Sequence, residues 1–470
     1  MRTEANSVAA QLEHLATLPF EDGNLAELIR ETLRDARPED IAEALERTPR
    51  EFDIQVLQAL DSETAAYVLI ELPTEQARTI VNELPDATVA HYLDILPMDD
   101  AVELREHLDA DRFEALLGVI PDEDAQEIRR LLSYPEDSAG QLLTEDFVEV
   151  GPEATMEDVL RTIREDTDEY ETVNYIYVLS SDRHLLGVLT LRRVIRAELT
   201  ALAREIMNPD PISVPVDMPE EDVARTMARY GFSAIPVLDG RGRMVGIITA
   251  DDAQEVLEDA QTEDVLALGG VLGDAESYLS LSVWQLVRRR LPWLMILFVA
   301  EFLTGSVLRH YTDQAGEAGQ TTLAQLMLFV PLLIGAGGNA GSQVTTTITR
   351  ALALGEVRAS DALRVIRREF VVSMTIGLIL GALGFLRAYL PGIGWGQPVS
   401  LSLVVGIALP SIIVWAAIVG SVLPIGAKAL KQDPAVMSAP FISTFVDATG
   451  MVIFFEVAKL VLSWYGVQYR

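Results

Sequence analysis

Apolar residues gather into long uninterrupted runs only beyond residue 290 of this chain. A helix needs enough apolar residues to cross roughly 30 Å of bilayer hydrocarbon. Five runs meet that length, at residues 291–308, 323–348, 370–390, 399–423 and 435–462. The pattern therefore predicts a C-terminal membrane domain of five helical spans over residues 289–470.

A shorter pattern repeats in the N-terminal third. A Leu or Ile followed by Pro or Asp recurs every 12 residues. Pro and Asp favour the first turn of a helix, and a two-turn helix with its connection takes about this length. We expect a right-handed stack of short helices over residues 20–130, within a helical domain of residues 1–138; a plain helical bundle is the alternative. The repeated pairs are Leu60-Asp61, Leu72-Pro73, Leu84-Pro85, Leu96-Pro97, Leu108-Asp109 and Ile120-Pro121.

Residues 140–260 carry one pattern of elements twice. Each copy reads strand, helix, strand, turn with Gly, strand, helix. This order and the Gly-apolar-apolar-Thr end of each copy resemble the CBS domain, here at residues 139–203 and 204–258, which normally occurs as a pair. The resemblance implies that Thr249 and Asp252 hold the ribose of an adenine nucleotide such as ATP. Thr190 is instead followed by Arg193, and a purely mechanical sensor is the alternative.

Charge divides the chain at the same place as hydropathy. Residues 1–290 carry 25 Arg, no Lys and 62 Asp and Glu, a net charge of −37. A surface this acidic disfavours nucleic acid and attracts cations. The chain has no cysteine, which excludes disulfides and thiolate metal sites. Its five histidines are scattered and no nucleophile–base pattern stands out, so we expect no enzyme.

Cationic residues predict the orientation of the spans. Ten Lys and Arg lie before span 1, between spans 2 and 3 and between spans 4 and 5, against Arg309, Arg387 and Arg470 on the other side. The N-terminus shows no pattern of a cleaved signal. We therefore expect a cell (inner or plasma) membrane protein with a cytoplasmic acidic half and an outside C-terminus.

Polar residues inside the spans mark candidate functional positions. Asn339 and Gln343 lie in a run of small residues whose glycines fit tight helix packing as well as a pore. Ser443, Thr444 and Asp447 share one face of the fifth span at helical spacing. All five are candidate pore residues.

Asp447 is the main candidate for the ion site. It lies 12 residues past the start of its apolar run, which places it roughly 18 Å into the bilayer. Glu301 of the first span is a rival with apolar helical neighbours. A single carboxylate among hydroxyl and amide groups suits hydrated Mg²⁺, which dehydrates reluctantly. No His cluster marks the spans, which disfavours Zn²⁺ and Cu⁺ as cargo.

With these parts in this order, the chain resembles the MgtE family of magnesium channels and transporters over nearly its whole length. The match is carried by Tyr-Pro-Glu-Asp-Ser-Ala-Gly at 134–140, Gly-Gly-Asn-Ala-Gly at 337–341, Asp-Pro-Ala-Val at 433–436 and Asp-Ala-Thr-Gly at 447–450. The resemblance implies a homodimer with one pore at the two-fold axis and Asp447 as its Mg²⁺-binding carboxylate. It also implies a plug helix at about 252–277, within a connecting segment of residues 252–288.

The resemblance further implies that cytoplasmic Mg²⁺ closes the pore by bridging acidic faces of the N domain, the CBS pair and the plug. Some relatives have acids or sensor contacts where this chain has Pro219, Gly231 and Ala260, which leaves the number of Mg²⁺ sites open. Each acid as an ordinary solvated residue is the alternative. The positions that fit are Glu221, Asp252, Glu255, Glu263, Asp264 and Asp433, with Asp99 and Glu103 in the N domain.

The sequence thus predicts a multidomain membrane protein with an all-α superhelical N domain, α/β tandem CBS domains, a long plug or connecting helix and an α-helical five-span transmembrane domain. Its predicted function is a Mg²⁺-selective, Mg²⁺-gated homodimeric channel surrounded by lipid. Mn²⁺ and Co²⁺ are further candidate ions, ATP is a candidate ligand of the CBS pair, and nucleic acid is not a partner. Two alternatives stay open: a Na⁺- or H⁺-coupled divalent-cation carrier, and a nucleotide-sensing membrane regulator.

Overall fold

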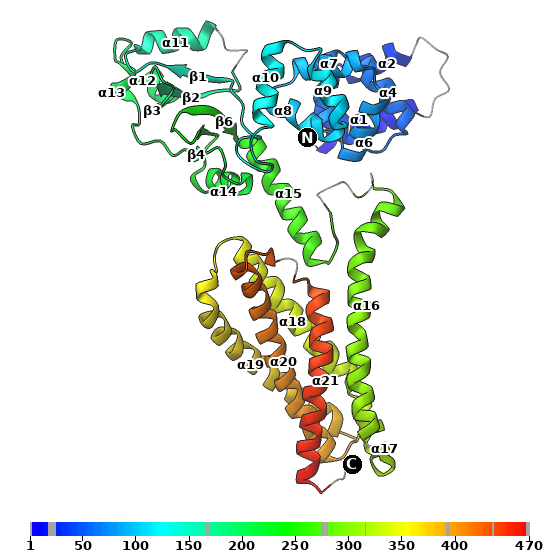
Figure 1. Ribbon diagram of the computed structural model, residues 1–470. Helices are drawn as coiled ribbons and strands as arrows, with labels where there is room; N and C mark the ends of the chain where they lie inside the picture. The colour runs from blue at the N-terminus through cyan, green and yellow to red at the C-terminus, as the bar shows by residue number, and fades with distance from the viewer. Residues whose placement is uncertain are drawn as a thin grey trace. The chain divides into compact units, whose positions relative to one another are not determined.

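The computed structural model describes residues 2–16, 25–165, 170–273, 278, 281–314, 316–391, 395–434 and 437–466. The chain separates into two compact units, each with its own hydrophobic core (Figure 1). Met1–Ala260 with Ala275–Ser282 is called the acidic unit below. Gln261–Asp274 with Val283–Arg470 is called the apolar unit.

Short helices begin the acidic unit, and the 12-residue repeat predicts where they start. Pro73, Pro85, Pro97 and Pro121 each stand just before the first turn of a helix, where a missing N–H leaves no helical bond unmade. The apolar residue before each of these prolines is buried. The predicted stack of short helices is confirmed. Its elements are α1 (Arg2–Ala16), α2 (Leu25–Leu33), α3 (Pro38–Leu45), α4 (Arg50–Ala59), α5 (Ser62–Ile70), α6 (Thr74–Glu83), α7 (Asp86–Ile95), α8 (Met98–Leu104), η1 (Arg105–His107), α9 (Ala110–Leu117) and α10 (Asp122–Leu131).

Two small three-stranded sheets follow, with the same topology in both copies. The first strand pairs parallel with the second, and the second pairs antiparallel with the third. The predicted duplication is confirmed. The first copy holds β1 (Phe147–Val150), α11 (Met156–Glu165), β2 (Thr172–Leu179), β3 (Leu185–Thr190), α12 (Leu191–Arg196) and α13 (Ala203–Ile206). The second holds β4 (Val214–Pro215), α14 (Glu220–Tyr230), β5 (Ala234–Leu238), β6 (Met244–Thr249) and α15 (Ala250–Leu268).

The prediction of a glycine in the turn of each copy is wrong for the first copy. There Arg183 adopts the positive φ of 61°, whereas Gly242 does so in the second copy with 77°. Gly187 and Gly246 lie inside strands, where a Cβ would meet Met207 Sδ at 2.6 Å or the Thr144 carbonyl oxygen at 2.6 Å. These glycines therefore make room for a crossing backbone segment rather than for a turn.

The helix after the second copy, α15, ends at Leu268 rather than continuing to residue 277 as predicted. Val271 N–H donates to the Leu266 carbonyl and Gly270 N–H to that of Ala267, while Gly270 has a φ of 72°. This pair of bonds is the Schellman ending, which needs a residue with positive φ. The connecting segment predicted at 252–288 is consequently not one helix. Residues 274–277 lie outside the described part of the chain.

The apolar unit consists of long helices. Three of them, α16, α20 and the segment Ala359–Tyr389 that contains α19, are long and apolar enough to cross a membrane. Gln320–Met327 and α18 form a fourth candidate as a pair bent by 42°. The helix at the predicted fifth span, α21, carries Asp447, Glu456 and Lys459 and is not among them. The elements are α16 (Val283–Gln314), α17 (Gly316–Met327), α18 (Val330–Ala353), η3 (Ala359–Asp361), α19 (Ala362–Tyr389), α20 (Val399–Ala429) and α21 (Ala439–Trp464).

Helices α16 and α21 run parallel and in register. Trp293 donates to Ser438, Tyr311 to Glu456, and Lys459 to Gln314, at 3.0, 2.7 and 3.0 Å, and each pair is 145 residues apart. Parallel helices that span a bilayer have an odd number of crossings between them. The bent α17–α18 pair, α19 and α20 supply three (Figure 1). This geometry agrees with α21 as a fifth span, whose crossing of a membrane stays a prediction.

Candidate functional site

A cavity of about 570 Å³ in the acidic unit is lined mainly by carboxylates. They come from the short helices, from the start of β2 and from α15, so distant parts of the chain meet there. None of the described residues that line it is Lys or Arg. The acids are Glu39, Glu46, Glu71, Asp99, Asp100, Glu103, Glu171, Asp251, Asp252, Glu255 and Asp259, beside Tyr67 and His107.

Burial and mutual repulsion make these carboxylates hard to ionise. Burial, with the charges of Asp100 and Asp252, raises the pKa of Asp99 from 3.8 to about 8. Burial, with the charge of Asp252, raises the pKa of Asp100 to about 7. The pKa of Glu255 is raised by the same two causes, burial first. A cavity of this kind favours either protons or cations, because like charges drawn out of water destabilise one another.

The cavity suits a hydrated cation better than a dehydrated one. In the described part of the chain, no three His, Cys, Asp or Glu side chains are arranged to hold one metal ion together. Mg²⁺ usually keeps several of its waters and meets proteins through one or two carboxylates. The arrangement can therefore hold Mg²⁺ through its waters.

The structure brings together half of the predicted sensor acids. Asp99, Glu103, Asp252 and Glu255 line the cavity. Glu221 does not; it forms an ion pair with Arg225 at 2.6 Å on α14. Glu263 and Asp264 lie farther along α15, on the part assigned to the apolar unit, and exposed Asp433 lies between α20 and α21. These three positions do not line the cavity.

Seven acids of the cavity were not predicted from the sequence. One had a local signal: Asp259 lies four residues after Glu255 on α15, so helical spacing places both on one face. Asp251 and Asp100 are next to predicted acids in sequence. Glu39, Glu46, Glu71 and Glu171 reach the cavity only through tertiary packing, for which the sequence offers no local signal.

Asp447 lies on α21, where this helix packs against the glycine-rich part of α18. A Cβ on Gly338 would meet Ser443 Oγ at 2.5 Å and Asp447 Oδ1 at 3.5 Å. The glycine therefore gives the carboxylate and the hydroxyl their space, as close packing of small residues requires. Among the described residues, Asp447 Oδ1 is buried with no hydrogen-bond partner. A polar atom left in this way is a candidate ion contact.

The other predicted pore residues are placed differently. Asn339 and Gln343 are exposed on α18. Ser443 is half-buried one turn before Asp447, whereas the Thr444 hydroxyl donates to the Pro440 carbonyl at 3.1 Å. Glu301 is exposed on α16. The described structure thus groups Asp447 most closely with Ser443.

Thr249 and Asp252, the predicted nucleotide contacts, bond to each other. The Thr249 hydroxyl donates to Asp252 Oδ2 at 2.6 Å at the start of α15. Asp252 also lines the acidic cavity, which repels phosphate.

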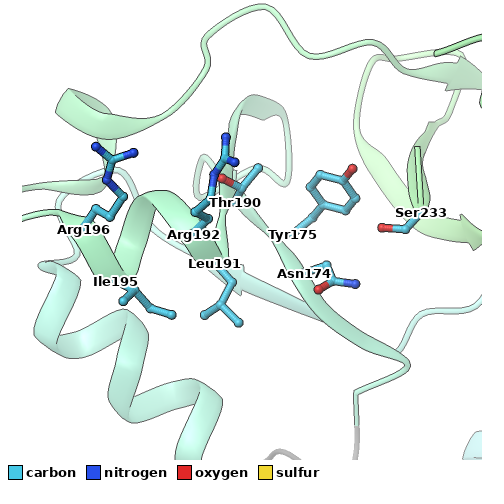
Figure 2. Close-up of a pocket in the computed structure, with 8 residues that line it drawn as sticks. All are labelled: Asn174, Tyr175, Thr190, Leu191, Arg192, Ile195, Arg196 and Ser233. Carbon is cyan, nitrogen blue, oxygen red and sulfur yellow. The ribbon is translucent and has the colours of Figure 1, made fainter. Parts of the chain in front are cut away.

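A cavity of about 600 Å³ at the other CBS copy has the opposite charge (Figure 2). Arg192 of α12 lies beside Thr190, Arg196 lies at the other end of the same helix, and Tyr175 and Ser233 also line the cavity. These two arginines are the charged residues in its described lining, and guanidinium groups bind phosphate. A neighbouring cavity shares Tyr175 and adds Phe232 and Pro236, an apolar surface for a base.

Three family models match this chain. The MgtE model, described as a divalent cation transporter, matches residues 330–457. The MgtE intracellular N domain matches residues 36–137, and the CBS domain matches residues 139–200 and 203–259. Together these matches cover more than half of the chain.

Two relatives share most of the chain. The magnesium transporter MgtE of Thermus thermophilus is 39% identical over 333 residues, 71% of this chain and 72% of that protein. The protein of the same name from Enterococcus faecalis is 33% identical over 335 residues, 71% of each. Among solved structures, the cytosolic domain of the Mg²⁺ channel MgtE in complex with ATP is 36% identical with a TM-score of 0.47, and covers 48% of this chain and 93% of that chain. The chain belongs to the MgtE family of divalent cation transporters, and so to a family of transporters rather than enzymes.

Proposed function

We propose that this chain carries Mg²⁺ across the cell membrane as a homodimeric channel, with Asp447 as the carboxylate that meets the hydrated ion. The observation that carries the proposal is the buried, unbonded Asp447 Oδ1 opposite Gly338. A carboxylate in an apolar helix bundle is costly unless it faces water or a cation. The N-terminal domains lie in the cytoplasm and the C-terminus outside, as the cationic residues between the spans favour.

The acidic cavity supports closure by cytoplasmic Mg²⁺ as the second half of the proposal. The carboxylates that line the cavity repel one another when they are ionised, and this repulsion contributes to the raised pKa values of Asp99 and Asp100. A divalent cation relieves the repulsion. A ligand shifts a conformational equilibrium by its differential affinity for the two states. Mg²⁺ that binds between the short helices and α15 therefore favours the state in which these elements stay together.

Replacement of Asp447 by Asn removes the charge and keeps the shape. We expect Mg²⁺ flux into liposomes that contain the full-length protein to fall by at least about tenfold, because attraction between the hydrated ion and the carboxylate is lost. Asp313→Asn, which removes an exposed carboxylate paired with Arg309 on α16, is the matched control and should leave flux unchanged. Flux that persists in the Asp447→Asn protein would contradict the pore assignment. Wild-type flux that requires an imposed Na⁺ or pH gradient would favour the coupled carrier.

Neutral residues in the cavity should weaken closure by cytoplasmic Mg²⁺. The double variant Asp99→Asn/Glu255→Gln replaces two carboxyl groups that line the cavity and that Mg²⁺ would meet in their ionised form, so the Mg²⁺ concentration for half-closure in patch recordings should rise about tenfold or more, with an unchanged maximal current. Glu221→Gln on α14 is the control, because that residue is paired with Arg225 outside the cavity. Glu263→Gln/Asp264→Asn tests the farther part of α15 in the same recordings. A cavity variant that closes like the wild type would exclude the cavity as the sensor.

The raised pKa values predict a pH dependence. Asp99 and Asp100 bind protons more tightly in the folded unit than at their ordinary pKa of 3.8, so the free energy of unfolding is highest below that pKa and falls as pH rises through the folded pKa values of about 7 and 8. Mg²⁺ binds the ionised form, so its apparent affinity should weaken about tenfold or more between pH 8 and pH 6. Mg²⁺ titration of the full-length protein, followed by hydrogen exchange at α8, measures this. Asp99→Asn should flatten the dependence; an affinity that is independent of pH would contradict it.

We also propose ATP as a ligand of the CBS pair, at the cavity of Arg192 and Arg196 rather than at Thr249. The support is the cationic lining there and the acidic surroundings of Asp252. Equilibrium dialysis of the full-length protein with ATP should show at least about tenfold weaker binding for Arg192→Ala/Arg196→Ala. Arg229→Ala, which lies outside both cavities, is the control. A loss of binding in Thr249→Val instead would return the site to the second copy.

A further inference from the structure

The segment that ends α15 lies against the first turns of α16. Leu272 N–H donates to the Arg289 carbonyl at 3.0 Å. Gly270 touches the Trp293 ring so closely that a Cβ there would overlap it. A Cβ on Gly273 would come within 2.9 Å of Arg289 Nε. All of these residues belong to the apolar unit, so the contacts lie within one compact body.

The same tryptophan is bonded to the start of α21. Trp293 Nε1 donates to Ser438 Oγ at 3.0 Å, and its ring lies 6.2 Å from that of Phe441, centroid to centroid. Ser438 is fully buried and caps α21 by accepting from Phe441 N–H. An N-cap satisfies backbone donors that a helix cannot satisfy itself, so its position sets the direction of the first turn.

Trp293 lies next to an interruption in the backbone hydrogen bonding of α16. Pro292 precedes it inside the helix, removing one backbone bond and disturbing the turn before it. The Arg289 carbonyl that Leu272 reaches lies in that turn. The end of α15 therefore contacts α16 beside this proline, at Arg289 and at Trp293, and Trp293 is also the residue that bonds to α21.

We propose that Trp293 is a positioning residue that couples the end of α15 to the helix carrying Asp447. The coupling rests on the proposed closure by Mg²⁺, since the start of α15 lines the acidic cavity. A displacement of α15 moves Gly270 against the indole, and the indole moves the Ser438 cap nine residues before Asp447. Trp293 lies outside the residues that the family models match, whereas Ser438 lies inside the match at residues 330–457.

The test is a double-mutant cycle on the hydrogen bond. Trp293→Phe keeps an aromatic ring but loses the indole N–H and the pyrrole edge next to Gly270, and Ser438→Ala loses the acceptor together with the cap bond to Phe441 N–H. Each should shift the Mg²⁺ concentration for half-closure about two- to tenfold, the range of one ordinary hydrogen bond. The double variant should shift by less than the sum of the two single variants, because both remove the same bond. Ser438→Thr, which keeps the hydroxyl, should restore the wild-type value.

Trp415→Phe is the matched control, since Trp415 donates to Thr449 of the same α21 at 2.9 Å without touching the end of α15. It should leave half-closure unchanged. Additive shifts, or an equal shift in Trp415→Phe, would overturn the coupling and indicate general loosening of α21. Wild-type closure with unshifted single variants would also overturn it.

A second readout works even without closure by Mg²⁺, and so separates failure of the coupling from failure of the proposed function. In the coupled case Ser438→Ala speeds hydrogen exchange of the peptide that contains residues 269–273, about threefold or more, although Ser438 does not belong to it. If exchange rises only in the first turn of α21, the coupling is wrong. If exchange rises in both places while wild-type protein ignores Mg²⁺, the coupling holds and the Mg²⁺ sensor is wrong.

Discussion

Carboxylates drawn together away from water destabilise one another, and the arrangement of this protein depends on that repulsion. The cavity of the acidic unit gathers eleven acids around a space without a Lys or Arg in its described lining. The raised pKa values of Asp99 and Asp100 reflect this repulsion and burial, because both carboxyls bind protons more tightly than a carboxyl in water does. A divalent cation reduces the same repulsion, because it brings two positive charges to the carboxylates. Cation binding in the cavity, as proposed above, would therefore stabilise the folded unit.

Local chemistry is sufficient to predict the elements but not the site. Prolines such as Pro73 and Pro85 mark helix starts because their effect is confined to one turn. The position of Asp447 in an apolar run is likewise a local feature, and it makes Asp447 the candidate for the ion site. Glu71 and Glu171 carry no such mark, since they reach the cavity through packing between the short helices and the first CBS copy. Spacing within one helix can be predicted from a sequence more readily than tertiary contacts between segments that are far apart in the chain.

The spacing of Thr249 and Asp252 fits two interpretations. Their separation of three residues fits a ribose contact, but it also fits a side-chain bond at the start of a helix, which is what forms. Thr155 and Asp158 make the same bond at the start of α11, at 2.6 Å. The arginines of α12 are better placed to meet phosphate, and they lie in the copy whose acid is replaced by Arg193. The charge of the surrounding cavity favours the proposed site at α12, on which spacing alone gives no information.

The proposed coupling runs from the end of α15 to Asp447 through helices α16 and α21. The 19 residues of α15 make a helix of roughly 28 Å, with cavity acids near its start and the Gly270 ending beyond its last turn. Trp293 joins that ending to the cap of α21, while Tyr311 and Gln314 bond to Glu456 and Lys459 near the other end of the same two helices. Because hydrogen bonds join α21 to α16 near both ends, we expect α21 to move as one body when its N-cap is displaced. Asp447 lies between the two attachments, where movement of the whole helix changes the position of its carboxylate relative to Gly338 and α18.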